Sequence, residues 1–154
     1  MPNIEIVQHK NRIDHVFSQV GALPPNDIEL RSHWARYLCV LVSGFIEKSV
    51  HGLLVDVASK QSSPTVARFV RNKVTDLQNP KMEKILELLR QFSSDWETRV
   101  RTATEGEYKA AVDSIVGNRN RIAHGENVQI SYESVRRYYQ SVVRVIEIIE
   151  SECS

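Results

Sequence analysis

One short stretch of the chain gathers side chains that could act on a phosphate ester: residues 118–125, Asn-Arg-Asn-Arg-Ile-Ala-His-Gly. His124 carries an imidazole, which can accept or donate a proton near neutral pH. Arg119 carries a guanidinium, which can hold two phosphate oxygens at once. Asn120 can fix the imidazole tautomer or bind a phosphate oxygen, and Arg121 can add a further phosphate contact. These residues predict RNA cleavage without a metal, in which a base takes the 2′-hydroxyl proton and a cation stabilises the phosphate.

The same residues also allow a purely structural interpretation, in which Arg119 and His124 close a helix end by binding neighbouring carbonyl oxygens. Glu47 is a further candidate, because a carboxylate within an apolar run either faces water or needs a buried partner such as Arg119. We expect Arg119, Asn120 and His124 to be catalytic, and Arg121 and Glu47 to be candidates for substrate binding. The remaining histidines show no metal-ligand spacing, so neither a metal nor another cofactor is expected.

The element that must position these residues is a helix that ends at the motif. The run 108–116 has apolar or small residues at helical spacing, and Ile122 continues the same stripe. Gly125 suits the left-handed conformation that often follows the last turn of a helix. Residues five apart, such as Arg119 and His124, lie roughly 140° apart around a helix axis. One helix therefore cannot easily bring both side chains to one atom, whereas a second copy packed by two-fold symmetry would let both chains line one cleft.

The motif resembles the HEPN family (higher eukaryotes and prokaryotes nucleotide-binding). Ribonucleases of that family carry an Arg, four to six residues and then a His at a helix end, often with a polar residue after the Arg; Arg119, Asn120 and His124 match. The sequence Asn-Arg-Ile-Ala-His-Gly is similar to the motif of HEPN proteins from bacterial defence and toxin–antitoxin loci, including the branch named for RNA ligase and phosphatase neighbours. The resemblance implies an endoribonuclease that leaves a 2′,3′-cyclic phosphate, acts at a composite site in a homodimer, and is restrained by an antitoxin or another protein partner.

Two other functions stay open on the sequence. A dimeric HEPN-like bundle could bind RNA, a nucleotide or another protein without cutting anything, or the motif could be only a cap in a structural helical protein. Tyr138 and Tyr139 could stack a base, although tyrosines at helical spacing more often pack in a core or an interface. Two basic clusters could follow RNA phosphates or could be solvated helix faces; they are Arg68, Arg71 and Lys73, and Arg136, Arg137 and Arg144.

The composition is that of an ordinary globular domain. With 154 residues, 42% of them hydrophobic and 25% charged, the chain can form a single domain, 1–154, with a sizeable core. A net charge of +1 gives no overall attraction to nucleic acid. Cys39 and Cys153 lack disulfide or metal spacing and fit a reducing cytoplasm. No secretory signal or membrane span is expected, because the longest apolar stretch, 37–46, is too short to cross a bilayer.

Apolar spacing and breaker residues predict an all-α, HEPN-like bundle of five or six helices. Residues 93–104 are expected to be irregular, with Trp96 as a lid and with Arg99 and Arg101 beside a site. The expected helices cover 2–20, then 27 to about 60 after an Asn26 cap, a short helix from Ser63-Pro64, one over 82–89, the motif helix opened by a Thr104–Glu107 capping box, and a final helix capped by Ser131.

Overall fold

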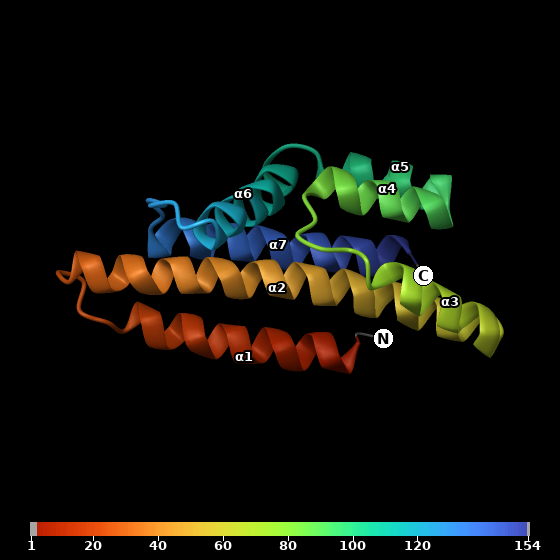
Figure 1. Ribbon diagram of the computed structural model, residues 1–154, viewed down its shortest axis with the longest axis horizontal. Helices are drawn as coiled ribbons and strands as arrows, with labels where there is room; N and C mark the ends of the chain where they lie inside the picture. Colours follow the sequence, from red (N-terminus) through yellow and green to blue (C-terminus); the bar gives the residue numbers. More distant parts are fainter. Residues whose placement is uncertain (1–2, 154) are drawn as a thin grey trace.

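The computed structural model describes residues 3–153, and within that range it has seven helices and no β-strand (Figure 1). The prediction of an all-α bundle is confirmed, but five or six helices is too few. The expected helical start at Pro2 lies outside the described residues. The helices are α1 (Ile4–Gly21), α2 (Ile28–Gln61), α3 (Pro64–Val74), α4 (Met82–Phe92), α5 (Ser94–Thr104), α6 (Glu107–Ala123) and α7 (Tyr132–Glu152).

The seventh helix is α5, in the segment that was expected to be irregular. Ser93 caps it by accepting a hydrogen bond from the backbone N–H of Trp96 at 3.3 Å. Only Val100 and Thr104 of α5 are buried, so the helix lacks the repeated apolar stripe from which a helix is recognised in a sequence. An ion pair between Arg101 and Glu97, at 2.8 Å and one turn apart, supports it along the exposed side.

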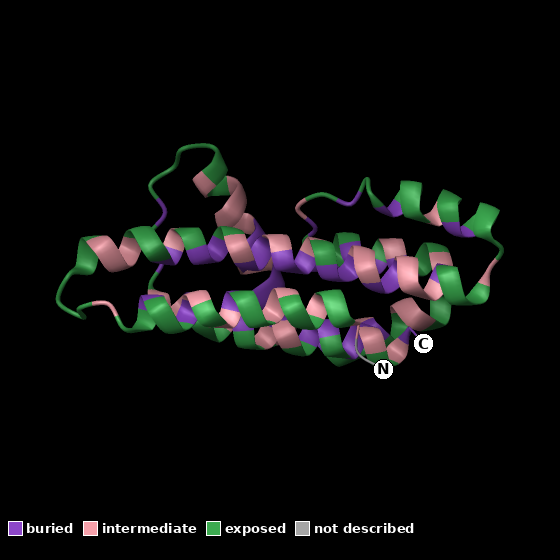
Figure 2. Cartoon of the chain, turned by 90° about the horizontal axis from the view of Figure 1, so that it is seen from below, coloured by how far each residue is buried: buried purple, intermediate pink, exposed green. Residues whose placement is uncertain are grey.

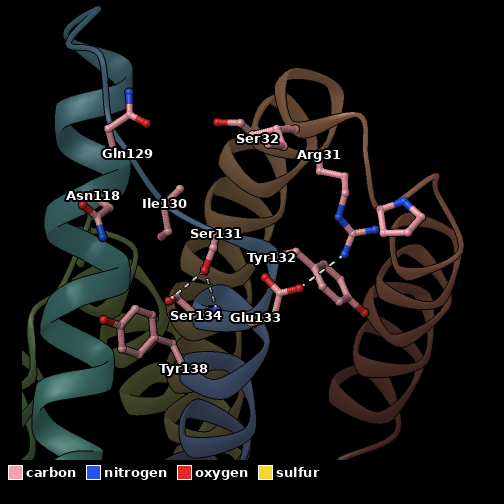
Figure 3. Close-up of a pocket in the computed structure, with 12 residues that line it drawn as sticks. Arg31, Ser32, Asn118, Gln129, Ile130, Ser131, Tyr132, Glu133, Ser134 and Tyr138 are labelled. Carbon is pink, nitrogen blue, oxygen red and sulfur yellow. Dashed lines mark hydrogen bonds and ion pairs between the residues drawn. The ribbon is translucent and has the colours of Figure 1, made fainter.

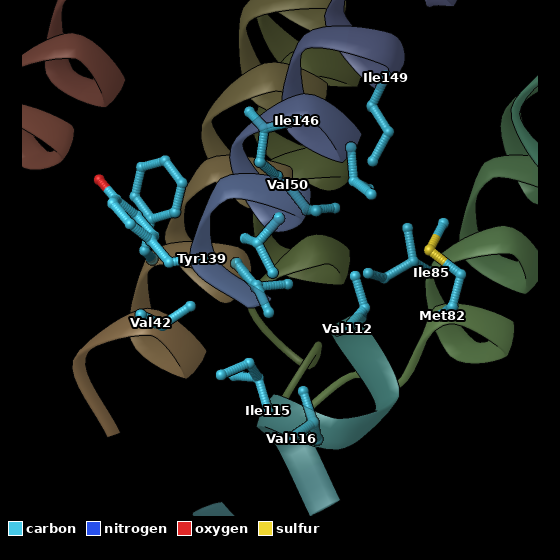
Figure 4. Packing of buried hydrophobic residues seen from close by; sticks show 14 of the residues in the cluster. Val42, Val50, Met82, Ile85, Val112, Ile115, Val116, Tyr139, Ile146 and Ile149 are labelled. Atoms are coloured by element: carbon cyan, nitrogen blue, oxygen red, sulfur yellow. The ribbon is translucent and has the colours of Figure 1, made fainter. Parts of the chain in front are cut away.

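The long helix α2 forms the centre of the bundle and contacts α1, α3, α6 and α7. It is long and apolar enough to cross a membrane by length and composition, but 56% of its most apolar stretch is buried inside the bundle, as in a core helix (Figure 2). The main core lies where α2, α4, α6 and α7 converge (Figure 4). Its labelled side chains include Val42, Val50, Met82, Ile85, Val112, Ile115, Val116, Ile146 and Ile149.

Helix caps explain most of the observed boundaries, and two expected caps are wrong. Asp27, not Asn26, caps α2, because Asn26 lies in a turn closed by a bond from the Asp27 N–H to the Pro24 carbonyl at 3.2 Å. Thr104 ends α5 and donates its hydroxyl to a carbonyl one turn earlier, so α6 begins after Gly106 instead. The expected caps of α3 and α7, Ser63 and Ser131, are both confirmed.

Two carboxylates hold the connection between α3 and α4 in place. Glu47 of α2 accepts a hydrogen bond from the backbone N–H of Asn79 at 3.1 Å. Asp113 of α6 accepts one from the backbone N–H of Met82 at 2.8 Å, and so caps α4 from a neighbouring helix. This bond fixes the middle of α6 against the start of α4, and the same carboxylate pairs with Lys109, one turn earlier on α6, at 2.9 Å. The motif at the end of α6 is therefore carried by a well-anchored helix.

Candidate functional site

The motif occupies the last turns of α6, as expected. His124 is the residue at which the helix ends, and Gly125 follows it with a φ of 78°, in the left-handed region. The backbone N–H groups of Gly125 and Glu126 bond back to helix carbonyl oxygens at 3.0 Å each, which forms a Schellman motif. The backbone at His124 is therefore held by the helix end on one side and by a left-handed glycine on the other.

The three side chains that were expected to be catalytic are available for binding. His124 is exposed, and Arg119 and Asn120 are half-buried. None of these three side chains makes a hydrogen bond or an ion pair to any other residue of the range 3–153. The structural interpretation, in which Arg119 and His124 bind carbonyl oxygens at the helix end, does not describe this arrangement, because backbone groups close the helix end by themselves. The catalytic roles stay predictions.

The two candidates for substrate binding differ in what holds them. Arg121 is exposed and lies 3.7 Å from Glu126, in an ion pair whose two side chains are 54% and 55% exposed. Such a pair contributes little stability, so the guanidinium can exchange it for a phosphate. Glu47 binds the Asn79 backbone, and among the described residues no ion pair joins it to Arg119. Glu47 therefore has a structural role, and its role in substrate binding stays a prediction.

A cavity of about 570 Å³ lies beside the motif, between the start of α2, α6 and the start of α7 (Figure 3). Asn118 lines it from α6, and Figure 3 shows Asn118 and Tyr138 at one end of the cavity with Arg31 at the other. Arg31 lies 5.2 Å from the centre of the Tyr132 ring, and its guanidinium pairs with Glu133 at 3.4 Å. Amide, hydroxyl and aromatic groups around such a space can bind the edge and the face of a nucleobase.

Sequence reasoning missed this cavity, although it named two of its residues. Asn118 belongs to the motif, but its position gives no sign of which neighbour it faces. Tyr138 was paired with Tyr139 as a base-stacking candidate, and the structure separates the two. Tyr139 is buried, stacks on Phe17 with ring centres 4.8 Å apart and donates its hydroxyl to Asp14 at 2.7 Å, so it belongs to the core. Tyr138 is half-buried and lines the cavity, so base stacking stays a prediction for Tyr138.

The aromatic and basic residues of α5 do not flank the motif as free groups. Trp96 stacks on Phe92 with ring centres 6.0 Å apart. Arg99 pairs with Glu152 at 2.9 Å, and Arg101 pairs with Glu83 at 2.7 Å as well as with Glu97. These residues fasten α5 to its neighbours α4 and α7. The roles of Trp96 as a lid and of Arg99 and Arg101 beside a site stay predictions, since the structure shows these side chains in contacts that fasten α5.

The basic clusters lie on helix surfaces, and the cysteines are buried. The α3 cluster is exposed; in the α7 cluster, Arg144 pairs with Glu147 at 3.1 Å. Burial raises the pKa of the Cys39 and Cys153 thiols to about 12 each. Across residues 3–153, no three His, Cys, Asp or Glu side chains gather in a way that could hold a metal ion.

The comparison with known families supports the resemblance that the motif indicated. The model of the family RiboL-PSP-HEPN matches residues 4–154. The chain therefore belongs to this HEPN-like family, and the resemblance first seen in eight residues extends over nearly the whole sequence. No curated protein and no solved structure matches the chain. Membership establishes the class of protein, whereas the reaction, the assembly and the cellular setting are proposals.

Proposed function

We propose that the protein is a metal-independent endoribonuclease of a toxin–antitoxin or phage-defence system, acting at a site shared by two copies of the chain. The observation that carries the proposal is the exposed, unpartnered His124 at the end of α6, with an unpartnered Arg119 about one and a half turns earlier. An imidazole and a guanidinium without internal partners, in a chain of the HEPN class, support a site for a phosphate ester.

The proposed reaction needs no group beyond the side chains of the motif and the RNA itself. One imidazole takes the proton of a ribose 2′-hydroxyl, and the 2′-oxygen attacks the adjacent phosphorus. The bond from phosphorus to the 5′-oxygen breaks, and that oxygen takes up the proton that the imidazole accepted, passed on through solvent. Arg119 binds the non-bridging oxygens, whose charge rises in the transition state. The products are a 2′,3′-cyclic phosphate and a 5′-hydroxyl, and Asn120 holds the imidazole or a phosphate oxygen during the step.

A second copy of the chain supplies what one helix end lacks, since Arg119 and His124 lie roughly 140° apart around the axis of one helix and cannot easily reach one phosphate together. An exposed apolar surface supports such an assembly. It consists of Trp34, Tyr37 and Val40 on one side of α2, which are 39%, 48% and 38% exposed. Exposed aromatic residues grouped in this way are typical of protein interfaces.

The direct test is cleavage of RNA in the presence of EDTA. We expect the purified protein to cut single-stranded RNA and to leave cyclic phosphate and 5′-hydroxyl ends. His124→Ala and Arg119→Ala should each abolish cleavage while leaving the melting temperature nearly unchanged, because neither side chain has an internal partner. His15→Ala, at another exposed histidine, is the matched control and should cut as the wild type does. Cleavage that needs Mg²⁺, or that survives in His124→Ala, would refute the assignment.

The cavity beside the motif favours one alternative, a HEPN-like module that binds RNA or a nucleotide without cutting it. Under that alternative the wild-type protein binds RNA, Asn118→Ala and Tyr138→Ala weaken binding, and no product forms. The proposed setting is the cytoplasm, where a toxin of this kind would be restrained by an antitoxin or another protein. Expression of the wild type should then slow growth, and Arg119→Ala or His124→Ala should relieve the effect.

A further inference from the structure

A second cavity, of about 220 Å³, lies between α1 and α2, and α1 and α6 lie on opposite sides of α2 in Figure 1. It has room for several water molecules at about 30 Å³ each, and hence for one tetrahedral oxyanion. Its lining includes His9 and Arg12, one helical turn apart on α1, and the adjacent residues Lys48 and Ser49 on α2. None of these residues belongs to the motif at the end of α6.

The Ser49 side chain is the feature that needs an explanation. Ser49 is only 1% exposed, and its Oγ has no hydrogen-bond partner in the part of the chain that the structure describes. A buried hydroxyl without a partner is costly, so such groups are usually satisfied by a neighbouring side chain, by water or by a ligand. Ser49 is also one of the residues that line the cavity, so a group bound there would lie next to this residue.

The charges around the cavity favour an anion. Arg12 and Lys48 are both exposed, and neither forms an ion pair with another residue between 3 and 153. His9 packs edge-on against Phe45 with ring centres 5.5 Å apart. The pKa of its imidazole is lowered mainly by burial, and further by the positive charges of Lys48 and Arg12. The lining contains one carboxylate, Glu5, which leaves an excess of positive charge. A negative group bound between Lys48 and Arg12 would offset the positive charge that these two residues place around the imidazole.

We propose that this cavity binds a phosphate group, held by the Arg12 guanidinium, the Lys48 ammonium and the Ser49 hydroxyl, with the His9 imidazole at its side. Two cations and a neutral donor match the several acceptor oxygens of a phosphate. The group can be free inorganic phosphate or the phosphate of a nucleotide or an RNA chain, since the recognised chemistry is the same. The site does not depend on the proposed ribonuclease activity, and it would exist in a protein that cuts nothing.

The test is an NMR titration that follows the imidazole resonances of His9. Inorganic phosphate, added at constant ionic strength against chloride, should shift these resonances in a saturable manner and raise the pKa of His9. We expect phosphate binding to weaken by about tenfold or more in the double variant Arg12→Gln/Lys48→Gln and also in the single variant Ser49→Ala. This is the effect of losing at least one hydrogen bond to a charged group. Ser49→Ala keeps both cations and places a good helix former within α2, so it tests the site without threatening the fold.

The matched control removes one Arg and one Lys from another exposed surface. Arg68→Gln/Lys73→Gln in α3 should bind phosphate as the wild type does. Competition by AMP, and by a short RNA in the His124→Ala background, tells whether the phosphate belongs to a nucleotide, to a chain or to neither; each result is compatible with the site. No saturable response at His9, full binding by the Arg12→Gln/Lys48→Gln variant, or equal weakening in the α3 control would overturn the proposal.

Discussion

Replacing Gly125 by Ala tests whether the left-handed end of α6 positions His124. Gly125 has a φ of 78°, and a Cβ added there meets nothing within 4 Å. The cost is therefore backbone strain alone, about 1–2 kcal/mol for an L-residue in this conformation. For a chain of this length we expect a fall in melting temperature of about 2–4 °C for each kcal/mol. Urea unfolding measures the free energy, and RNA cleavage in EDTA measures the function.

Variants of two other glycines serve as controls that distinguish an effect on stability from an effect on RNA cleavage. Gly106→Ala also introduces backbone strain without a close neighbour, but at the start of α6; its φ of 90° and ψ of −127° lie in a region used almost only by glycine, so its cost in stability should be at least as large. Gly44→Ala lies inside α2 with nothing within 4 Å, so it should stabilise the protein by up to about 1 kcal/mol. We expect RNA cleavage to fall more in Gly125→Ala than in Gly106→Ala at a temperature where both variants are folded. A Gly125→Ala protein as stable and as active as the wild type would refute this account of the helix end.

Three further predictions concern parts of the chain outside the motif. Ser49→Ala should raise the free energy of unfolding by about 1–2 kcal/mol in phosphate-free buffer, because it removes a buried, unpartnered hydroxyl; an unchanged or lower urea midpoint would contradict this. The pKa of His9 is lowered from 6.5 in the folded protein, so the unfolded chain binds more protons just below pH 6.5. The free energy of unfolding should therefore fall as the pH drops below 6.5, and it should fall less steeply in His9→Gln. Cys39 and Cys153, which are buried with pKa values raised to about 12, should react with a thiol reagent at pH 8 only as the protein unfolds, and rapid labelling of the native protein would argue against their burial.

The sequence predicted best where the determining chemistry is local. Gly125 after an amphipathic run indicates a helix end, and Ser63 before a proline indicates a helix start, because a few neighbouring residues decide each conformation. The same local reasoning failed at Asn26, where the adjacent Asp27 is an equally good cap and the turn at Pro24 decides between them. It also failed at Thr104, whose hydroxyl binds the preceding helix instead of opening the next one.

Features that depend on packing between distant segments were not visible in the sequence. The cavity beside the motif forms only where Arg31, Asn118 and Tyr138 come together from three helices. The partner of Glu47 is a backbone group 32 residues away, and nothing near Glu47 in the chain indicates it. Candidate side chains can thus be identified from residue type and spacing, whereas the surfaces that they face follow only from the assembled bundle.

The central claim is that Arg119 of one copy acts together with His124 of another, and mixed dimers test it most directly. Arg119→Ala and His124→Ala, each inactive alone, are unfolded together, refolded as a mixture and assayed for RNA cleavage in EDTA. The account predicts that activity returns in the mixture, because the mixed dimer contains one cleft with an intact guanidinium from one chain and an intact imidazole from the other. A mixture that forms folded mixed dimers and still cuts no RNA would contradict it.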